Sequence, residues 1–357
     1  MNTVNKTQPE ITIVVPILNE RVQLPLLLEN LQQQQQVDYE LLVVDGGSAD
    51  GSLEWLAEHA TAKVIHAKEP GRAGQLNLGA SSATANWLLF LHGDSLFADP
   101  FALRKALDRL YQTGSQKVAG HFALKFRRQD VDPSPGYYFY EWKARLGRPE
   151  TIHGDQGFLV SKSLFDKLGG FCEELRVMED TDFAERLREN GQWCLLPAEV
   201  STSARRFEIE GLWQRQLLGA LIMCFRDIGW QQFFVEAQGV YRHQGEVDRL
   251  QLRPFFQLVR RLLREMGGSK AMRLWWQSGG YVRRHAWQLT FALDARREFR
   301  RAVPVGKGAL RLTRFFEPVY NLITGNPLGQ LAATVLLRVW FEMTDLWLRV
   351  NEGKARG

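Results

Sequence analysis

The chain has 357 residues, of which 45% are hydrophobic and 24% charged, a composition typical of a globular protein. This length allows one large domain or two ordinary ones. Three widely spaced cysteines without a Cys-x-x-Cys pair argue against a zinc site or a disulfide framework and favour a reducing, cytosolic setting. No run of about 18 uncharged apolar residues occurs, and residues 1–6 lack an apolar core, so neither a spanning helix nor a signal peptide is expected.

The net charge of +5 is unevenly distributed along the chain. From Gln231 onward there are 21 Lys and Arg against 10 Asp and Glu, whereas the first 230 residues carry 24 against 30. Such asymmetry predicts a basic C-terminal module that faces an anionic partner, either membrane lipid or nucleic acid.

Four strand-like apolar segments alternate with helix-like segments in the first hundred residues. The strands are expected at residues 11–17, 40–45, 63–66 and 87–91. Leucines at helical spacing follow the first strand, capping side chains follow the second, and a Gly-rich loop at residues 70–74 follows the third. Strands that alternate with helices predict βαβ units and a parallel sheet.

The pattern changes after Asp99. The expected elements are a strand at 118–126, helices at 137–142 and 179–189, an extended segment at 192–196 and a helix at 211–225. A domain boundary is expected near residues 229–244, and the part beyond it is helical and rich in Arg and Trp.

The apolar strand that ends at Leu91 runs directly into His92-Gly93-Asp94. A carboxylate at the C-terminal end of a buried strand lies at the sheet edge where open α/β sheets bind ligands. Its hard oxygen atoms suit a divalent cation that holds phosphates. Asp94 could equally be a turn residue that caps the following helix.

Three further polar segments complete a set of four in a fixed order. Pro16-Ile17-Leu18-Asn19-Glu20 follows the first strand, residues 45–51 (DGGSADG) follow the second, and Met178-Glu179-Asp180 opens a later helix. Together with residues 92–94, this order resembles the inverting glycosyltransferases of family 2, which have the GT-A fold. The resemblance covers roughly residues 10–230.

Two other segments, residues 154–158 (GDQGF) and 203–207 (SARRF), resemble a bacterial subgroup of that family. The resemblance implies an α/β fold with a Rossmann-like mixed sheet flanked by helices. It divides the chain into a GT-A domain at 1–230 and a helical region at 231–357.

The resemblance also implies a nucleotide-sugar donor site. Asp45 would accept the imide N–H of uracil, or it is a plain turn residue. Glu20 would hold the ribose or base, or it caps the next helix. Arg72, in its Gly-flanked loop, suits bidentate phosphate contact but could be an exposed loop arginine. Arg206 would reach the diphosphate after a loop closes. The other expected donor-site residues are Pro16, Asn19, Gly46, Gln75, Asn77, His92 and Asp94, and Gln75 and Asn77 could instead be surface polar residues.

The chain departs from the family at the metal motif. The usual Asp-x-Asp is His92-Gly93-Asp94 here. The resemblance implies that Asp94 binds Mg²⁺ or Mn²⁺, which neutralises the departing nucleoside diphosphate. His92 is either a nitrogen ligand, which would favour Mn²⁺, or a packed histidine with one hydrogen bond.

Asp180 is the expected general base, because inversion needs one carboxylate to take the proton of the attacking hydroxyl. Glu179 would orient the acceptor or support Asp180. Both could merely stabilise a helix N-terminus, where carboxylates are favoured. Asp155 and Gln156, between glycines, would bind hydroxyls of the sugar or acceptor.

The C-terminal region is expected to be helical and basic. Residues 331–350 are apolar round most of a helical circumference, with one narrow polar stripe. Such a helix is either buried in a bundle or lies in a bilayer interface. Arg and Trp together fit anionic lipid headgroups, whereas no nucleic-acid motif is present, so no nucleic-acid partner is expected.

The sequence therefore predicts an inverting glycosyltransferase that moves a sugar from a nucleotide donor, a UDP-sugar by the Asp45 match, to a hydroxyl acceptor. The basic region suggests a lipid-linked or membrane-proximal acceptor, with the protein in the cytoplasm or on the cytoplasmic face of the inner membrane. The Gln-x-x-Arg-Trp motif of processive synthases is absent. Two alternatives remain: a nucleotidyltransferase that makes nucleotide sugars, and a non-catalytic lipid or carbohydrate adaptor on a GT-A scaffold.

Overall fold

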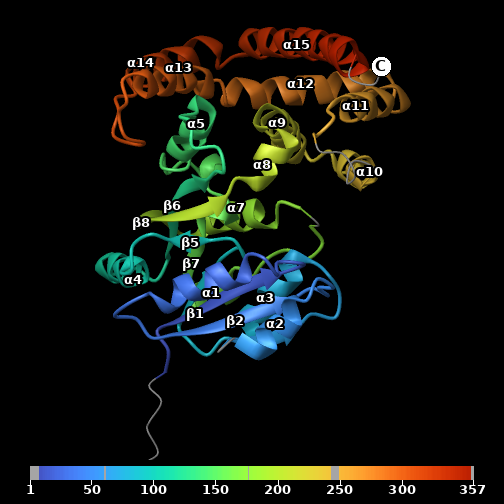
Figure 1. The fold of residues 1–357 in the computed structure, drawn as a ribbon. Coiled ribbons are helices and arrows are strands. Elements are labelled where there is room, and N and C mark those ends of the chain that lie inside the picture. Colours follow the sequence, from blue (N-terminus) through green and yellow to red (C-terminus); the bar gives the residue numbers. More distant parts are fainter. Residues whose placement is uncertain (1–7, 60–61, 176, 243–248, 355–357) are drawn as a thin grey trace, which may run out of the picture. The chain divides into compact units, whose positions relative to one another are not determined.

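The computed structural model describes residues 8–59, 62–175, 177–242 and 249–354 (Figure 1). The chain forms two compact units, one of residues 1–129 and 140–203 and the other of residues 130–139 and 204–357. The boundary expected near residues 229–244 lies inside the second unit by this division, and its last residues, 243–244, lie outside the described part.

The first unit contains one eight-stranded sheet in the order β3-β2-β1-β4-β7-β6-β8-β5. Its parallel half consists of β1 (Ile11–Ile17), β2 (Tyr39–Asp45), β3 (Lys63–His66) and β4 (Trp87–Phe90). These four strands confirm the segments predicted from apolar runs. β1 is buried on both faces because helices cover both sides of the sheet, which is why its sequence is continuously apolar.

The other half makes the sheet mixed, as the expected fold class requires. It consists of β5 (Leu96–Phe97), β6 (Val118–Arg127), β7 (Phe158–Ser161) and β8 (Gln192–Ser203). β7 runs antiparallel to both β4 and β6, and β8 runs parallel to β6 and antiparallel to β5. The short strands β5 and β7 were not predicted, and β8 extends past the predicted residues 192–196.

Helices pack on both faces of this sheet. The helices are α1 (Leu24–Gln32), α2 (Ser52–His59), α3 (Arg72–Ser82), α4 (Ala102–Gln112), α6 (Lys162–Lys167) and α7 (Glu179–Asn190). Ile13 and Val15 of β1 share a core with α1 and α4, whereas Val14 between them shares a core with α3, α6 and α7. The two-residue alternation of a strand therefore builds a three-layer α/β/α unit. Two single-turn 3₁₀ helices, η1 (Pro149–Thr151) and η2 (Gly154–Gln156), precede β7.

The second unit is helical, as expected of the C-terminal region. Its helices are α8 (Arg205–Glu210), α9 (Leu212–Asp227), α10 (Gln231–Arg242), α11 (Arg253–Glu265), α12 (Gly268–Arg284), α13 (Trp287–Arg300), α14 (Arg311–Thr324) and α15 (Pro327–Lys354), while α5 (Pro135–Lys143) has residues in each unit. Phe225, Phe233, Phe255, Phe256 and Phe341 centre its core. In the described part of the chain, no helix is both long and apolar enough to cross a bilayer.

Candidate functional site

The loops after β1 and β2 are bonded to each other at the carboxyl edge of the sheet. The amide of Asn19 donates to Ser48 Oγ at 2.9 Å, and the amide of Ala49 donates to Asn19 Oδ1 at 2.8 Å. Asn19 has a φ of +59°, in the left-handed region that Asn tolerates better than most residues. The two loops that carry Glu20 and Asp45 therefore hold each other in place.

Asp45 lies at the end of β2 with 2% of its surface exposed. Its carboxylate accepts hydrogen bonds from the amides of Gly47 at 2.8 Å and Ser48 at 3.1 Å. Asp45 is thus a turn residue, and its bonds to the turn amides orient its carboxylate. Contact with a nucleotide base stays a prediction, because the group is both buried and bonded to its own turn in this structure.

Gln75, expected either at the donor or on the surface, is buried and joins two strand ends. Its Nε2 donates to the carbonyl of Ile17 at 2.9 Å and to that of Val44 at 2.7 Å. A Cβ placed on Gly46 would lie 2.9 Å from Gln75 Oε1, so Gly46 allows this amide to cross the sheet edge. The surface alternative for Gln75 is wrong, because the side chain is 4% exposed and its amide donates to backbone carbonyls of two strands.

Asn77 and Pro16 also have structural contacts. Asn77 Nδ2 donates to the Phe171 carbonyl at 2.8 Å, and Asn77 Oδ1 accepts from the Phe171 amide at 2.9 Å. Asn77 therefore ties α3 to the segment before α7. Pro16 is paired with Val44 in the sheet. Donor contacts of both residues stay predictions.

The His92-Gly93-Asp94 loop lies against the first motif. A Cβ on Gly93 would be 3.4 Å from Glu20 Cγ, so the Glu20 side chain packs over this glycine. Asp94 Oδ2 accepts hydrogen bonds from Thr202 Oγ1 and from the Ser203 amide, both at 3.0 Å. The end of β8 thus orients the carboxylate that the sequence placed at the metal.

Arg127, at the end of β6, is a residue of this site that sequence reasoning missed. Its guanidinium donates to the Asp94 carbonyl at 2.6 Å and to the Ser201 carbonyl at 2.7 Å. Burial lowers the pKa of Arg127, and the Asp94 carboxylate opposes that shift. The available signal was its position directly after an alternating strand, since strand ends converge at one sheet edge.

Arg72, the first residue of α3, contacts two other predicted site residues. Its Nε lies 3.3 Å from Glu179 Oε1, and its terminal nitrogen contacts His92 Nε2. Burial lowers the pKa of His92 to about 3. The nearby charge of Arg72 adds to this shift, and the charge of Asp180 opposes it. The imidazole is therefore neutral and accepts from the guanidinium.

Asp180 lies at the start of α7, two residues after a strained residue. Met178 before it has a φ of +68°, which is uncommon for a non-glycine residue and clusters at functional sites. The Asp180 carboxylate accepts from the Gly154 amide and from the Thr181 amide, each at 2.7 Å. A Cβ on Gly154 would lie 3.0 Å from both Asp180 Oδ2 and an Arg72 nitrogen, so glycine lets this pair approach.

The two adjacent carboxyl groups of α7 are shifted in opposite directions. Burial raises the pKa of Asp180, but Arg72, His153 and the two amide donors outweigh it, so the net shift is downward. Burial raises the pKa of Glu179, Arg72 opposes this and Asp180 adds to it, so the net shift is upward. Paired groups with separated pKa values are typical of acid–base sites, and Asp180 is the member whose pKa is lowered.

Gln156, which was expected to bind the acceptor, is buried. Gln156 is 1% exposed, its Oε1 is 2.7 Å from His121 Nδ1 and its Nε2 donates to the Thr151 carbonyl at 2.6 Å. An acceptor cannot touch it in this structure, so it supports the loop that carries Asp155. Burial lowers the pKa of the enclosed His121 to about 4, which keeps this support neutral.

Asp155 carries a buried oxygen, Oδ1, with no hydrogen-bond partner among the described residues. Burial raises the pKa of Asp155 to about 7; repulsion from Asp180 and Asp94 adds to the shift, and Arg72 opposes it. Three carboxylates are therefore within electrostatic reach of one another around one guanidinium.

Replacing Asp155 by Asn should make the protein less sensitive to rising pH. The folded-state pKa of about 7 is above the ordinary value of 3.8, so the folded state binds more protons between these values and stability falls as pH rises from about 4 to about 7. The loss is at most about 4 kcal/mol, from 1.36 kcal/mol per pKa unit. Urea unfolding at pH 5 and pH 8 measures it, with Asp108→Asn at an exposed position of α4 as control. An equal stability difference between wild type and Asp155→Asn at both pH values would contradict the raised pKa.

The carboxylates fit a divalent cation better than the imidazole does. The unpartnered Asp155 oxygen and the mutual repulsion of Asp94, Asp155 and Asp180 indicate excess negative charge that a hard cation would offset. His92 Nε2 faces Arg72 and is not open to a metal in this structure. The described residues contain no cluster of three or more His, Cys, Asp or Glu arranged to hold a metal ion by themselves. Oxygen atoms of a bound diphosphate would have to complete the coordination.

Arg206 belongs to the second unit and lies in the first turn of α8, not in the loop that the sequence suggested. Its guanidinium donates to Glu210 at 3.0 Å and to the Tyr241 hydroxyl at 2.6 Å. Its contact with the donor diphosphate stays a prediction.

Comparisons with known proteins agree with this geometry. Residues 12–169 match the model of glycosyl transferase family 2. An uncharacterized glycosyltransferase of Haemophilus influenzae is 28% identical over 186 residues, which are 50% of this chain and 61% of that protein. A PGL/p-HBAD biosynthesis glycosyltransferase of Mycobacterium bovis is 28% identical over 191 residues, 51% of this chain and 71% of that protein.

Among solved structures, a mannosyltransferase of Pyrobaculum calidifontis in complex with GDP-Man and Mn²⁺ is 18% identical, with a TM-score of 0.47 over 94% of this chain and 88% of that one. The mixed sheet with helices on both faces and the motif-bearing strand ends define a glycosyltransferase domain of GT-A type. Residues 12–169, which make up less than half of the chain, are therefore similar to glycosyl transferase family 2.

Proposed function

We propose that the protein is an inverting glycosyltransferase that moves a sugar from a nucleotide-sugar donor to a hydroxyl acceptor. The observation that carries the proposal is the ionised carboxylate of Asp180, held by two backbone amides beside Arg72, in one cluster with Asp94 and Asp155. In this cluster Asp180 is a base and Arg72 is a cationic group that suits phosphate. Asp94 and Asp155 add further carboxylates at the same sheet edge.

In the proposed reaction, the acceptor oxygen attacks the anomeric carbon on the face opposite to the diphosphate. The new carbon–oxygen bond forms as the bond to the diphosphate breaks, and the nucleoside diphosphate leaves with the electron pair. Asp180 takes the hydroxyl proton, so charge and atoms balance and the anomeric configuration inverts. Against burial, which raises the pKa of Asp180, the Arg72 charge, His153 and the two amide donors lower it and so favour the ionised form for this role.

The donor is proposed to be a UDP-sugar. Asp45 is oriented by its turn toward the same edge as Glu20, which supports recognition of the nucleoside there. Arg72 provides a guanidinium suited to the diphosphate, and it is 38% exposed. The His92 contact would have to yield for Arg72 to turn toward phosphate.

Mg²⁺ or Mn²⁺ is the proposed cofactor, with Asp94 as its protein ligand. When bound, such a cation neutralises the charge of the departing diphosphate. Thr202 and the Ser203 amide bind Asp94 Oδ2. These bonds fix the plane of the carboxylate, so the direction in which Oδ1 points is also fixed. Ligation by His92 is part of the proposal only if Arg72 moves away from its Nε2.

The acceptor is proposed to be lipid-linked or close to a membrane, with the protein on the cytoplasmic membrane face. The support is the basic C-terminal region, which has 21 Lys and Arg against 10 Asp and Glu from Gln231 onward. Anionic lipid attracts such a segment.

Nucleotide calorimetry tests the donor site. UDP and GDP are titrated with Mn²⁺, with Mg²⁺ and with EDTA, into wild type, Asp94→Ala and the control Asp108→Ala at an exposed position of α4. We expect UDP binding that requires the metal, and a loss of at least tenfold in Asp94→Ala alone, from a lost charged ligand. Wild type that binds neither nucleotide in any condition would overturn the donor site and favour a non-catalytic adaptor.

Product analysis separates the transferase from a nucleotidyltransferase. The proposed reaction releases a nucleoside diphosphate from a nucleotide sugar, whereas a nucleotidyltransferase releases pyrophosphate from a nucleoside triphosphate. Pyrophosphate release that depends on Asp94 would contradict glycosyl transfer.

A further inference from the structure

Helix α15 presents its apolar side chains to the outside of the second unit. One face, which includes Thr334, Phe341, Asp345 and Leu348, is buried. The opposite face is exposed and consists of Leu328, Leu331, Val335, Leu336, Val339, Met343, Leu346, Trp347 and Val350. Leu336 and Met343 are 68% and 67% exposed, so this face is not covered within the described chain.

Asp345, in the polar stripe of α15, is turned toward the protein, and the other members of the stripe are exposed beside it: Arg338, Glu342 and Arg349. Asp345 is fully buried and accepts from Arg260 Nε of α11 at 2.6 Å and from Arg349 at 2.7 Å. Glu342 also pairs with Arg260. A helix on a water-exposed surface has the opposite arrangement, with apolar residues inward and charges outward. The helix is therefore built for an apolar environment on its outer side.

Helix α14 extends this surface. Its exposed apolar residues are Phe315, Phe316, Val319, Leu322 and Ile323. α14 joins α15 through a short turn, and Figure 1 shows the two helices along the same side of α12 and α13. We call the exposed apolar residues of α14 and α15 together the outer face. A contiguous apolar face of this kind marks a membrane or protein contact.

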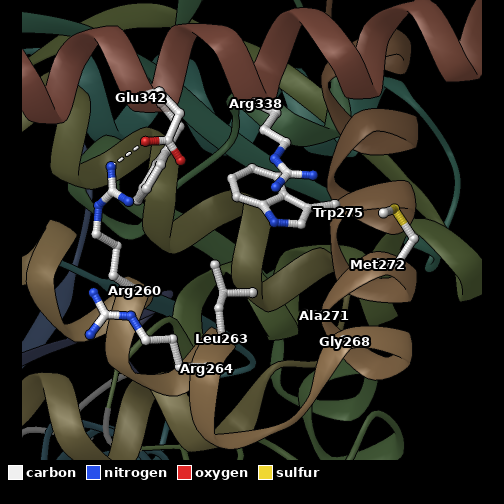
Figure 2. A pocket seen from close by; sticks show the side chains of 10 residues that line it. Arg260, Leu263, Arg264, Gly268, Ala271, Met272, Trp275, Arg338 and Glu342 are labelled. Atoms are coloured by element: carbon white, nitrogen blue, oxygen red, sulfur yellow. Dashed lines mark hydrogen bonds and ion pairs between the residues drawn. The ribbon is translucent and has the colours of Figure 1, made fainter.

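A basic pocket adjoins the outer face. It has a volume of 330 Å³ and lies between α11, α12 and α15 (Figure 2). Arg264 and Arg338 contribute guanidinium groups, and Leu263, Met272 and Trp275 contribute apolar walls. Arg260 in the same pocket is neutralised by Glu342 and Asp345. In contrast, neither Arg264 nor Arg338 has an acidic partner within the part of the chain that the structure describes.

We propose that this pocket takes the phosphate of an anionic phospholipid, and that the outer face lies among the acyl chains at the membrane surface. Two unpaired guanidinium groups suit a phosphate, and apolar walls suit the start of an acyl chain. Because no described helix is fit to span a bilayer, α14 and α15 would lie in the plane of the interface.

Charge favours lipid over a second copy of this chain as the occupant. The region from Gln231 onward has an excess of basic residues, and Arg296, Arg297, Arg300, Arg311 and Arg314 are exposed near the ends of α13 and α14. Two copies meeting through this surface would bring like charges together, whereas an anionic membrane would neutralise them.

The proposal deepens the proposed function, since it names the surface that would bring the enzyme to a membrane-bound acceptor. It is tested without donor or acceptor, so its failure and the failure of glycosyl transfer are distinguishable. The full-length protein is mixed with vesicles of phosphatidylcholine, alone or with phosphatidylglycerol, and bound protein is measured by flotation at several salt concentrations.

We expect binding to the anionic vesicles that weakens with salt. The double variant Arg264→Ala with Arg338→Ala should bind roughly 30-fold more weakly, from about a fivefold effect of each charge. Leu336→Asp with Met343→Asp should abolish binding to both vesicle types. Matched controls are Arg188→Ala on α7 and Val235→Asp on α10, which change an exposed arginine and an exposed apolar residue elsewhere. Circular dichroism and UDP calorimetry check that each variant is folded.

Three outcomes would overturn the proposal. Anionic vesicle binding that is equal in wild type and the double arginine variant would remove the pocket from the interaction. Calorimetric binding of inorganic phosphate without any vesicle binding would assign the pocket to a free phosphate. A dimer in sedimentation velocity that Leu336→Asp with Met343→Asp converts to a monomer, without vesicle binding, would assign the outer face to a second copy.

Discussion

Replacement of Asp180 by Asn is expected to lower kcat by about 10²–10⁴-fold, the usual contribution of a general base. The asparagine amide cannot take the proton of the acceptor hydroxyl. UDP binding should change by less than threefold, because the predicted nucleoside contacts of Asp45 and Glu20 lie on other loops. Steady-state kinetics with a UDP-sugar and calorimetry with UDP separate the two effects.

Asp182 offers a matched control on the same helix. It lies two residues further along α7 and pairs with Arg186 at 2.7 Å, so Asp182→Asn removes a carboxylate without touching the Arg72 cluster. Its kcat should stay near that of wild type. If Asp180→Asn and Asp182→Asn lose activity equally, or if both lose it only in proportion to lost folded protein, Asp180 is not the base.

Replacement of Arg72 by Ala is expected to weaken UDP binding by about 10–100-fold, the range for a lost hydrogen bond to a charged group. It should also change the pH dependence of kcat/KM. Burial raises the pKa of Asp180, and Arg72 is the first among the groups that oppose it. Without Arg72 the pKa of Asp180 rises, so the base becomes protonated at higher pH and the acid limb of the profile moves upward.

Arg72→Lys distinguishes the two roles of the guanidinium. Lysine keeps a positive charge near Asp180 but cannot form a bidentate contact with phosphate. The acid limb should therefore return toward the wild-type position, while UDP binding stays weaker than in wild type. An acid limb that stays in place in Arg72→Ala would contradict the electrostatic link between Arg72 and Asp180.

The strand ends were predictable because of local patterns. Continuous apolar runs predicted β1, β2 and β4, and the polar residues directly after them were placed at one sheet edge. A parallel strand that is buried on both faces appears in the sequence as a continuous apolar run. The polar residues after the run therefore mark the turn at the C-terminal end of the strand. Glu20 and Gly93, about seventy residues apart, do meet at that edge.

The roles of amide side chains were not predictable. Gln75 and Gln156 look like ordinary polar residues in the sequence, yet both are buried and satisfy backbone carbonyls or a buried histidine. Which carbonyls lie within reach of a side-chain amide depends on how strands from distant segments end beside each other. The same applies to Arg127, whose partner Asp94 is 33 residues away in the sequence.

The sequence by itself determined the fold class, the motif order and the helical, basic character of the C-terminal part, because apolar periodicity and charge are local properties. It left open whether the apolar helix at residues 331–350 faces a core or the outside. Only the tertiary structure decided this, because Arg260, the partner of the buried Asp345 in the polar stripe, comes from another helix. Once Asp345 is paired with Arg260 inside the unit, the opposite face of α15, with Leu336 and Met343, has to point outward.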